Sequence, residues 1–335
     1  QLLMVSGFER YYQIARCFRD EDLRADRQME FTQIDLEMSF VDEEDVHQVI
    51  ENMLKTIFKD VMNIDLVTPF PRLRFDESME RYGNDKPDTR FGLELQNIND
   101  IASNMDFSVF KDAINNGGVV KCINVKGAAN KYSRKDIDAF TEQIKKFKAK
   151  GLAWFKYDGS AVSGGISKFI TEDVLNSLVQ KLGLEADDLV LIVADKKNVV
   201  NASLAYLRNF FGKDLGLIDE NKYNFVWIVD WPSFEYSEEE NRYIAAHHPF
   251  TMPKDEWKDK LLTEPENCYS KCYDVVLNGY ELGSGSIRIH EPQVQKDMFK
   301  AIGLTDEQAQ EKFGFFVDAF KYGTPPHGGM ALGLD

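Results

Sequence analysis

Residues 7–40 read GFERYYQIARCFRDEDLRADRQMEFTQIDLEMSF, and this stretch decides the fold. Gln13 to Arg19 has the composition of a strand, and Phe31 to Phe40 alternates strictly between apolar and polar side chains. A charged connection, Asp20 to Glu30, joins them, although hairpin loops usually have only about two to five residues. The pattern predicts a β-hairpin with a tip longer than structure alone requires. Apolar residues at helical spacing in Asp42 to Val61 predict an amphipathic helix next.

Charge divides the chain into three parts. Residues 1–100 carry 12 basic and 22 acidic side chains, residues 101–215 carry 17 and 13, and residues 216–335 carry 11 and 21. The basic middle part reflects either chance drift of composition or a domain inserted into a discontinuous one. Insertions enter at surface loops, so the two acidic parts can still pack together. The second interpretation predicts the segments 1–98, 99–214 and 215–335.

The two later parts differ in their expected elements. The middle part predicts an α+β module with strands at 119–124, 152–157 and 189–194 and helices at 133–150, 171–182 and 199–211. The last part predicts strands at 224–231, 272–281 and 286–290, followed by helices at 292–303 and 305–320.

Composition excludes several classes of protein. Hydrophobic residues make up 43% of the 335, which is enough for a core and excludes a disordered chain. The net charge of −16 argues against a protein that coats nucleic acid non-specifically. We find no apolar run of the roughly 18 residues that a membrane helix needs and no signal peptide. Four cysteines are too few for a disulfide framework, and the CxxxC spacing of Cys268 and Cys272 favours ordinary thiols over a zinc site.

Arg19 is a candidate phosphate ligand. It ends the first strand, on the face that carries Gln13, Ala15 and Cys17, and the charged tip begins directly after it. A planar guanidinium on a rigid strand can bind a phosphate with two hydrogen bonds. The alternative is a solvated, salt-bridged hairpin tip, which is the commoner fate of such charge runs.

Asp274 and Glu281 are candidate magnesium ligands, because Mg²⁺ prefers oxygen donors. Their spacing would place them on opposite faces of a regular strand, unless a bulge at Gly279 redirects one of them. The following glycines, Gly283 and Gly285, would let a flat ligand lie against the backbone, or would simply form a weakened strand turn. A P-loop is excluded, since no lysine and no helix follow.

His247 and His248 lie in a loop after an acidic stretch, where they could bind metal, act as bases or be exposed. A metal is the least favoured of these, because no partner has ligand spacing. Arg288 alternates with Ile287 and Ile289 on a predicted strand, so it requires an anionic partner. Glu37, Asp35 or a carboxylate substrate could be that partner.

Several long motifs resemble the bacterial-type aspartyl-tRNA synthetases, which are class II aminoacyl-tRNA synthetases. Residues 7–40 resemble motif 2 of that family, and AAHHPFTMP resembles its flipping-loop region. NGYELGSGSIRIHEP and KYGTPPHGGMALGLD resemble the strand and the start of motif 3. VKGAANKYSRKDID and KGLAWFKYDG resemble the bacterial insertion (GAD-type) domain, which also occurs in a tRNA amidotransferase subunit.

The resemblance implies a fold and a set of roles. The fold is an α+β class II synthetase, with an antiparallel sheet flanked by helices and an inserted α+β domain. Arg19 would be catalytic, contacting the ATP α-phosphate and the aspartate carboxylate. Asp274 and Glu281 would hold Mg²⁺. The remaining residues would bind ATP (Asp20, Glu21, Gln28, Glu281, Gly333, Leu334, Asp335) or L-aspartate (Asp35, His247, His248, Arg288).

The same resemblance implies an aspartate–tRNA ligase with ATP, L-aspartate and tRNA(Asp) as partners, a cytoplasmic location and a homodimeric full-length protein. Motif 1 and the motif 3 arginine are missing from this sequence, so we expect the chain by itself to be inactive or impaired. Two alternatives stay open at this point: a non-catalytic tRNA-binding paralogue, and a module related to the tRNA amidotransferase.

Overall fold

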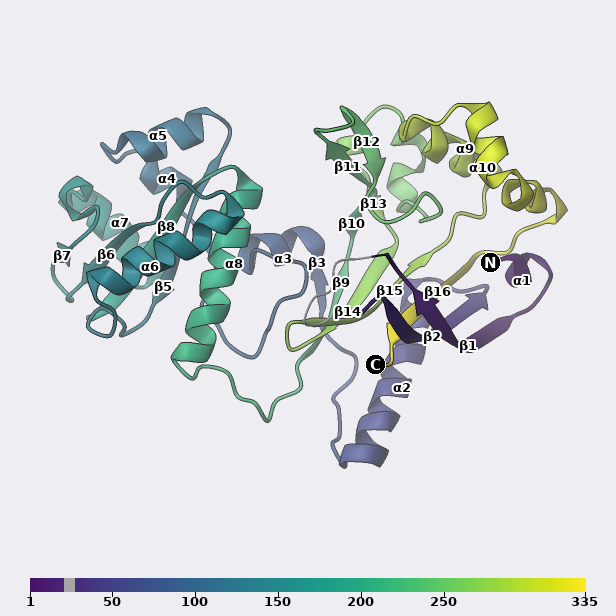
Figure 1. Ribbon diagram of the computed structural model, residues 1–335, viewed down its shortest axis with the longest axis horizontal. Coiled ribbons are helices and arrows are strands. Elements are labelled where there is room, and N and C mark those ends of the chain that lie inside the picture. The colour runs from purple at the N-terminus through teal and green to yellow at the C-terminus, as the bar shows by residue number, and fades with distance from the viewer. Residues whose placement is uncertain (21–27) are drawn as a thin grey trace. The chain divides into compact units, whose positions relative to one another are not determined.

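The computed structural model describes residues 1–20 and 28–335, and the chain forms two compact units (Figure 1). Unit 1 comprises Gln1–Asp76 and Phe225–Asp335, and unit 2 comprises Glu77–Asn224. The fold is α+β, with antiparallel sheets flanked by helices, as expected from the sequence. Within the described ranges, no helix combines the length and the apolar character needed to cross a bilayer.

Unit 1 is built on a seven-stranded sheet in the order β1-β2-β16-β15-β14-β9-β3, in which only the β3–β9 pair is parallel. Its strands are β1 (Arg10–Phe18), β2 (Glu30–Ser39), β3 (Arg72–Arg74), β9 (Phe225–Val229), β14 (Cys272–Leu277), β15 (Tyr280–Ile287) and β16 (His327–Gly333). Two small antiparallel pairs accompany it, β10 (Trp231–Pro232) with β13 (Tyr269–Ser270) and β11 (Phe234–Ser237) with β12 (Arg242–Ala245). The helices are α1 (Leu2–Val5), α2 (Glu43–Met62), α9 (Pro292–Ala301) and α10 (Asp306–Ala319).

The expected hairpin and the helix after it are both present. β1 and β2 pair in antiparallel register from Arg10 opposite Met38 to Phe18 opposite Glu30. Asp42 begins α2 with a capping box, in which its side chain and that of Asp45 bond each other's backbone N–H groups. Asn63 ends the helix in the left-handed conformation, with φ 55°. Helix α2 therefore covers Glu43–Met62, within one residue of the range expected from the sequence.

The single strand expected at 272–281 is wrong, because the chain reverses within it. β14 ends at Leu277, and Leu277 lies opposite Tyr280, so Asn278 and Gly279 form a two-residue turn. Both have positive φ, 52° and 90°. An Asn-Gly pair favours this conformation at both positions, which is why it joins the strands of a hairpin. Gly279 thus forms the turn of the β14–β15 hairpin and hosts no bulge.

Helix α2 covers one face of this sheet (Figure 1). Its side chains Val46, His47 and Ile50 are buried. The His47 ring stacks on Trp227 of β9 at 4.1 Å between centroids and meets the edge of Tyr273 of β14 at 4.8 Å. This is the apolar face of the sheet, and the opposite face carries polar side chains.

Unit 2 is a five-stranded sheet between two layers of helices. The order is β4-β5-β8-β6-β7, and all pairs are antiparallel. Alternate residues of β8 enter two separate cores, Leu189 and Leu191 with α6 and α8, and Val190 and Ile192 with α4, α5 and α7. The elements are β4 (Gln96–Asn97), β5 (Val119–Val125), β6 (Ala153–Tyr157), β7 (Val162–Ser163), β8 (Asp188–Asp195), α4 (Asn99–Ala102), α5 (Ser108–Asn115), α6 (Arg134–Ile144), α7 (Glu172–Leu182) and α8 (Lys197–Asp214), with α3 (Phe75–Arg81) crossing the unit boundary.

The limits of unit 2 differ from the segment limits that charge predicts. Residues 77–98 belong to it, because Leu95 lies in its core and the buried Arg208 of α8 binds the backbone of residues 88–92. Arg208 Nη2 donates to the carbonyl oxygens of Asp88, Phe91 and Gly92 at 2.7–2.9 Å. These hydrogen bonds reduce the cost of burying the Nη2 side of the guanidinium.

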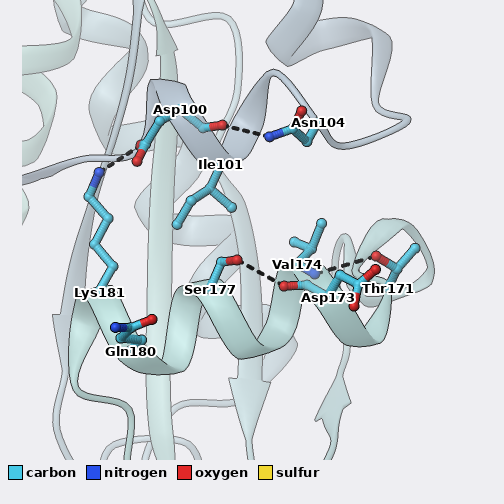
Figure 2. Close-up of a pocket in the computed structure, with 9 residues that line it drawn as sticks. All are labelled: Asp100, Ile101, Asn104, Thr171, Asp173, Val174, Ser177, Gln180 and Lys181. Atoms are coloured by element: carbon cyan, nitrogen blue, oxygen red, sulfur yellow. Dashed lines mark hydrogen bonds and ion pairs between the residues drawn. The ribbon is translucent and has the colours of Figure 1, made fainter.

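A pocket of about 740 Å³ lies in unit 2 beside α4 and α7 (Figure 2). Its polar groups bond to one another: Lys181 Nζ lies 2.6 Å from Asp100 Oδ1, and Ser177 donates to the Asp173 carbonyl at 2.9 Å. None of the site residues predicted from the sequence lines this pocket. The candidate site therefore has to be sought in unit 1.

Candidate active site

Strand register brings the predicted site residues of unit 1 to one face of the seven-stranded sheet. Residues opposite one another in neighbouring strands share a face. One row across the sheet is Gln13, Asp35, Ala331, Ser284 and Asp274. The next row is Tyr11, Glu37, Gly329, Ser286 and Cys272. We call this the polar face; it lies opposite the face that α2 covers.

Glycines in β15 serve the packing of the apolar face. Gly285 lies opposite Tyr273, and a Cβ there would come within 2.5 Å of the Tyr273 ring and 2.3 Å of the Gly329 carbonyl oxygen. The Tyr273 hydroxyl donates to that carbonyl at 3.0 Å. The two neighbours of Gly285 in the strand, Ser284 and Ser286, lie on the polar face. Gly285 therefore makes room for the buried tyrosine.

A β-bulge places Asp274 and Glu281 on the same face. Asp274 lies opposite Ser284, but the register shifts after Val275, so that Val276 lies opposite Glu281 and Leu282 is the additional residue. Asp274 and Val276 share a face, and so do cross-strand partners. The bulge that the sequence spacing required thus exists, at Leu282. Asp274 is 5% exposed, whereas Glu281 is exposed to solvent.

Arg288 follows β15 and lies among groups of the polar face. Its Nε is 3.7 Å from Glu37 Oε1, and its Nη1 contacts the His248 ring. Burial raises the pKa of Glu37, and the guanidinium opposes that shift. Burial, and then the cationic Arg288, lower the pKa of His248 to about 3. His248 is therefore uncharged at neutral pH, so Arg288 and not the imidazole supplies positive charge here.

Glu37 is an addition to the predicted set of site residues. It is 7% exposed, and with Asp35 and Tyr11 it lines a pocket of about 380 Å³ beside α1 and Phe316 of α10. The sequence does indicate this residue: Glu37 is one of the polar residues that alternate with apolar ones in 31–40, and so it lies on the same face as Asp35. Its burial could not be foreseen, because it depends on strand β16, which lies nearly 300 residues later in the chain.

Among the described residues predicted to bind ATP, all except Glu281 of β15 lie around the end of the β1–β2 hairpin. The Arg19 backbone continues the pairing, donating to the Met29 carbonyl at 2.8 Å, and its guanidinium lies 5.0 Å from the centre of the Phe31 ring. Asp335 Oδ2 accepts from the Thr32 backbone N–H at 2.7 Å. Arg19, Asp20, Gln28, Gly333, Leu334 and Asp335 are all exposed, and Glu21 lies outside the described residues.

The two histidines have different neighbours. His248 contacts Arg288, whereas His247 lies near the carboxylate of Asp274 and the thiol of Cys272. The site thus contains a half-buried arginine, two carboxylates on one face of the sheet, and an exposed arginine at the hairpin end. Such a set can bind an anionic amino acid and a nucleotide phosphate side by side.

Comparisons with known proteins extend over the whole chain. The family model described as tRNA synthetases class II (D, K and N) matches residues 1–335. The chain is 62% identical to the aspartate–tRNA ligase of Macrococcus caseolyticus and 59% identical to the aspartate–tRNA(Asp/Asn) ligase of Geobacillus sp., each over 335 residues. Those alignments cover 100% of this chain but 57% and 56% of the relatives, so the chain spans little more than half of their length.

A solved structure, an aspartyl tRNA synthetase from Entamoeba histolytica, is similar at a TM-score of 0.44 and 17% identity. The similarity covers 99% of this chain and 45% of that one.

Proposed function

Because this chain belongs to the class II tRNA synthetases (D, K and N), we propose that the protein is an aspartate–tRNA ligase. The observation that carries the proposal is the charge arrangement of the polar face. A half-buried arginine, Arg288, lies between the buried Glu37 and a neutral His248, on the same face as Asp35 and Asp274. The names of relatives about 60% identical support the same choice of amino acid.

Arg288 would select aspartate by binding its side-chain carboxylate. Its Nε faces Glu37 at 3.7 Å, which is too long for a hydrogen bond, so its donors are incompletely used by that contact. Asparagine has nearly the same shape but would leave the guanidinium without an added anion. Asp35 would hold the α-ammonium group, and His247 and His248 would complete the pocket.

Activation needs an in-line attack by the aspartate α-carboxylate on the α-phosphorus of ATP. The new bond joins a carboxylate oxygen to phosphorus, pyrophosphate leaves, and aspartyl-adenylate forms. Little proton transfer is required, so positioning and charge neutralisation supply the catalysis. Arg19 would contact the α-phosphate and the attacking carboxylate. Asp20, Glu21, Gln28 and residues 333–335 would bind the rest of ATP.

The residues present fit a magnesium ion. Asp274 and Glu281 both offer carboxylate oxygens, and the bulge at Leu282 puts them on one face as diagonal neighbours in adjacent strands. When bound, Mg²⁺ would neutralise phosphate charge.

In the second half-reaction, a ribose hydroxyl at the 3′ end of tRNA(Asp) attacks the activated carbonyl, and AMP leaves. The resemblance to the synthetase family supports a homodimer and a cytoplasmic location as part of the same proposal. One of the relatives is named for tRNA(Asp/Asn), and the other is named without specifying the tRNA.

The direct test is exchange of labelled pyrophosphate into ATP by the full-length protein, with one amino acid added at a time. The proposal predicts exchange with aspartate and none with asparagine or lysine. Exchange that requires asparagine or lysine instead of aspartate would overturn the assignment of the amino acid.

A further inference from the structure

His247, Cys272 and Asp274 form a group of potential metal ligands on the polar face. One donor atom from each, an imidazole nitrogen, the thiol sulfur and a carboxylate oxygen, all lie within 4.8 Å of one another. In a tetrahedral zinc site, bond lengths of about 2.0–2.3 Å place such donors roughly 3.3–3.8 Å apart. The donor atoms would therefore have to approach one another by at most about 1.0–1.5 Å to reach ligand distance.

Two elements hold the group in place. Cys272 and Asp274 are two residues apart on β14, so the pleat of the strand points both to the same face. They are 2% and 5% exposed. His247 comes from the loop after β12, and its ring meets the face of Trp231 edge-on at 4.7 Å and 89°. The indole is fixed in turn, because it is buried and its Nε1 donates to the Ile228 carbonyl at 3.1 Å.

From this geometry we infer that the protein has a binding site for a soft divalent cation, Zn²⁺ being the best match, at His247, Cys272 and Asp274. A thiolate and an imidazole are the ligands that Zn²⁺ prefers, whereas Mg²⁺ requires oxygen ligands. Cys272 loses its proton to solvent on coordination. His247 is exposed, so the ion can enter from solvent and a water can complete the four ligands.

This site overlaps the one proposed for Mg²⁺, because the two share Asp274. Occupancy by Zn²⁺ would therefore remove a ligand from the magnesium site, and the two ions would exclude each other there. The CxxxC spacing is irrelevant to it: the Cys268 thiol donates to the Glu264 carbonyl at 3.2 Å, and both cysteines are free.

The test uses metal ions alone and the intact protein, so its outcome does not depend on the proposed enzymatic function. Co²⁺ is the spectroscopic substitute for Zn²⁺, because a cobalt–thiolate bond gives a charge-transfer band. We expect this band on addition of Co²⁺, and its loss when Zn²⁺ displaces the cobalt. Cys272→Ala removes the band, whereas the matched variant Cys268→Ala, another buried cysteine four residues earlier, retains it.

His247→Gln provides a second variant, since an exposed side chain can be changed without disturbing the core. It should weaken Zn²⁺ binding by at least about tenfold, the lower bound for loss of a group that supports a metal site. Absence of a thiolate band in the unmodified protein would overturn the inference. A band that persists in Cys272→Ala, or Zn²⁺ affinity unchanged by His247→Gln, would also overturn it.

Discussion

Arg288 is the residue on which the proposed choice of substrate depends. It is the cation between Glu37 and the uncharged His248. Arg288→Lys keeps a positive charge for Glu37 but loses the planar fork that binds a carboxylate with two hydrogen bonds. We expect kcat/KM for aspartate to fall roughly 30-fold. This corresponds to a loss of about 2 kcal/mol of transition-state stabilisation, the lower end for breaking a buried charge pair. KM for ATP should stay unchanged.

The matched control for that variant is Arg16→Lys, on the exposed edge strand β1, where Arg16 pairs with Glu30. Steady-state exchange kinetics at varied aspartate measure both variants. An Arg288→Lys protein with the aspartate kinetics of the Arg16→Lys control would contradict the proposed role of Arg288.

His47 makes stability depend on pH. Burial between Trp227 and Tyr273 lowers its pKa to about 4 from 6.5. Between those two values the unfolded chain binds the proton and the folded one does not, so acid favours unfolding. The stabilisation that comes from keeping the His47 imidazole neutral is complete above pH 6.5. It declines as the pH falls and is lost near pH 4. Lowering the pKa of His47 from 6.5 to about 4 corresponds to about 3 kcal/mol of the free energy of unfolding.

His47→Phe keeps an aromatic ring but removes the titration, so its urea midpoint should fall less between pH 7 and pH 4.5 than that of the unmodified protein. Gln48→His is the control, because it adds an exposed histidine to the same helix. If His47→Phe and the unmodified protein lose stability in parallel over this range, the assigned burial of the neutral imidazole is wrong.

At the scale of elements, the β14–β15 hairpin depends on the glycine opposite Tyr273. Gly285→Ala would place a methyl group 2.5 Å from the tyrosine ring and 2.3 Å from a carbonyl oxygen. Such overpacking costs about 1–3 kcal/mol. Gly333→Ala is the control in the same sheet, since the nearest atom there is 4.0 Å away. Urea unfolding should show Gly285→Ala alone destabilised, and equal midpoints for the two variants would contradict the packing described.

Local sequence signals predicted some elements well and others badly. The strict alternation of residues 31–40 and the helical spacing of apolar residues after Asp42 predicted β2 and α2 correctly. The strand expected at 272–281 is wrong, because the Asn278-Gly279 turn within it reverses the chain. The polar face could not be derived at all. It depends on the order β2-β16-β15-β14, which joins strands far apart in the sequence.

Chemistry and resemblance predict which residues belong to the candidate site, but they do not predict which of these residues lie next to one another. The sequence named Glu37 as one possible partner of Arg288, and the structure brings these two side chains together. It gave no sign that His247 and His248 have separate neighbours, or that Cys272 lies near His247. Adjacent residues in a loop can point to different groups, and only the folded backbone decides which.

At the scale of the whole molecule, the structure predicts where the inserted part can be cut out. Unit 2 has its own two cores, and Arg208 depends on carbonyls at residues 88–92. A fragment of residues 77–224 should therefore unfold cooperatively. A fragment of residues 99–214 keeps Arg208 but lacks those carbonyls and Leu95. It should be less stable by about 3 kcal/mol or more, the scale for losing one buried leucine such as Leu95 from a core.

Thermal unfolding followed by circular dichroism compares the two fragments. Equal midpoints would contradict the assignment of residues 77–98 to unit 2, and would favour the limits that charge alone predicts.

The central claim is that the polar face of unit 1 and the end of the β1–β2 hairpin together activate aspartate with ATP. The most direct measurement is aspartate-dependent exchange of pyrophosphate into ATP by the full-length protein. The unmodified protein is compared with Arg19→Ala, and Arg16→Ala is the control. The account predicts exchange in the unmodified protein and in Arg16→Ala, and a loss of roughly 100-fold or more in Arg19→Ala, the scale for removing one charge-stabilising donor. Absence of aspartate-dependent exchange in the intact protein, or full activity in Arg19→Ala, would contradict it.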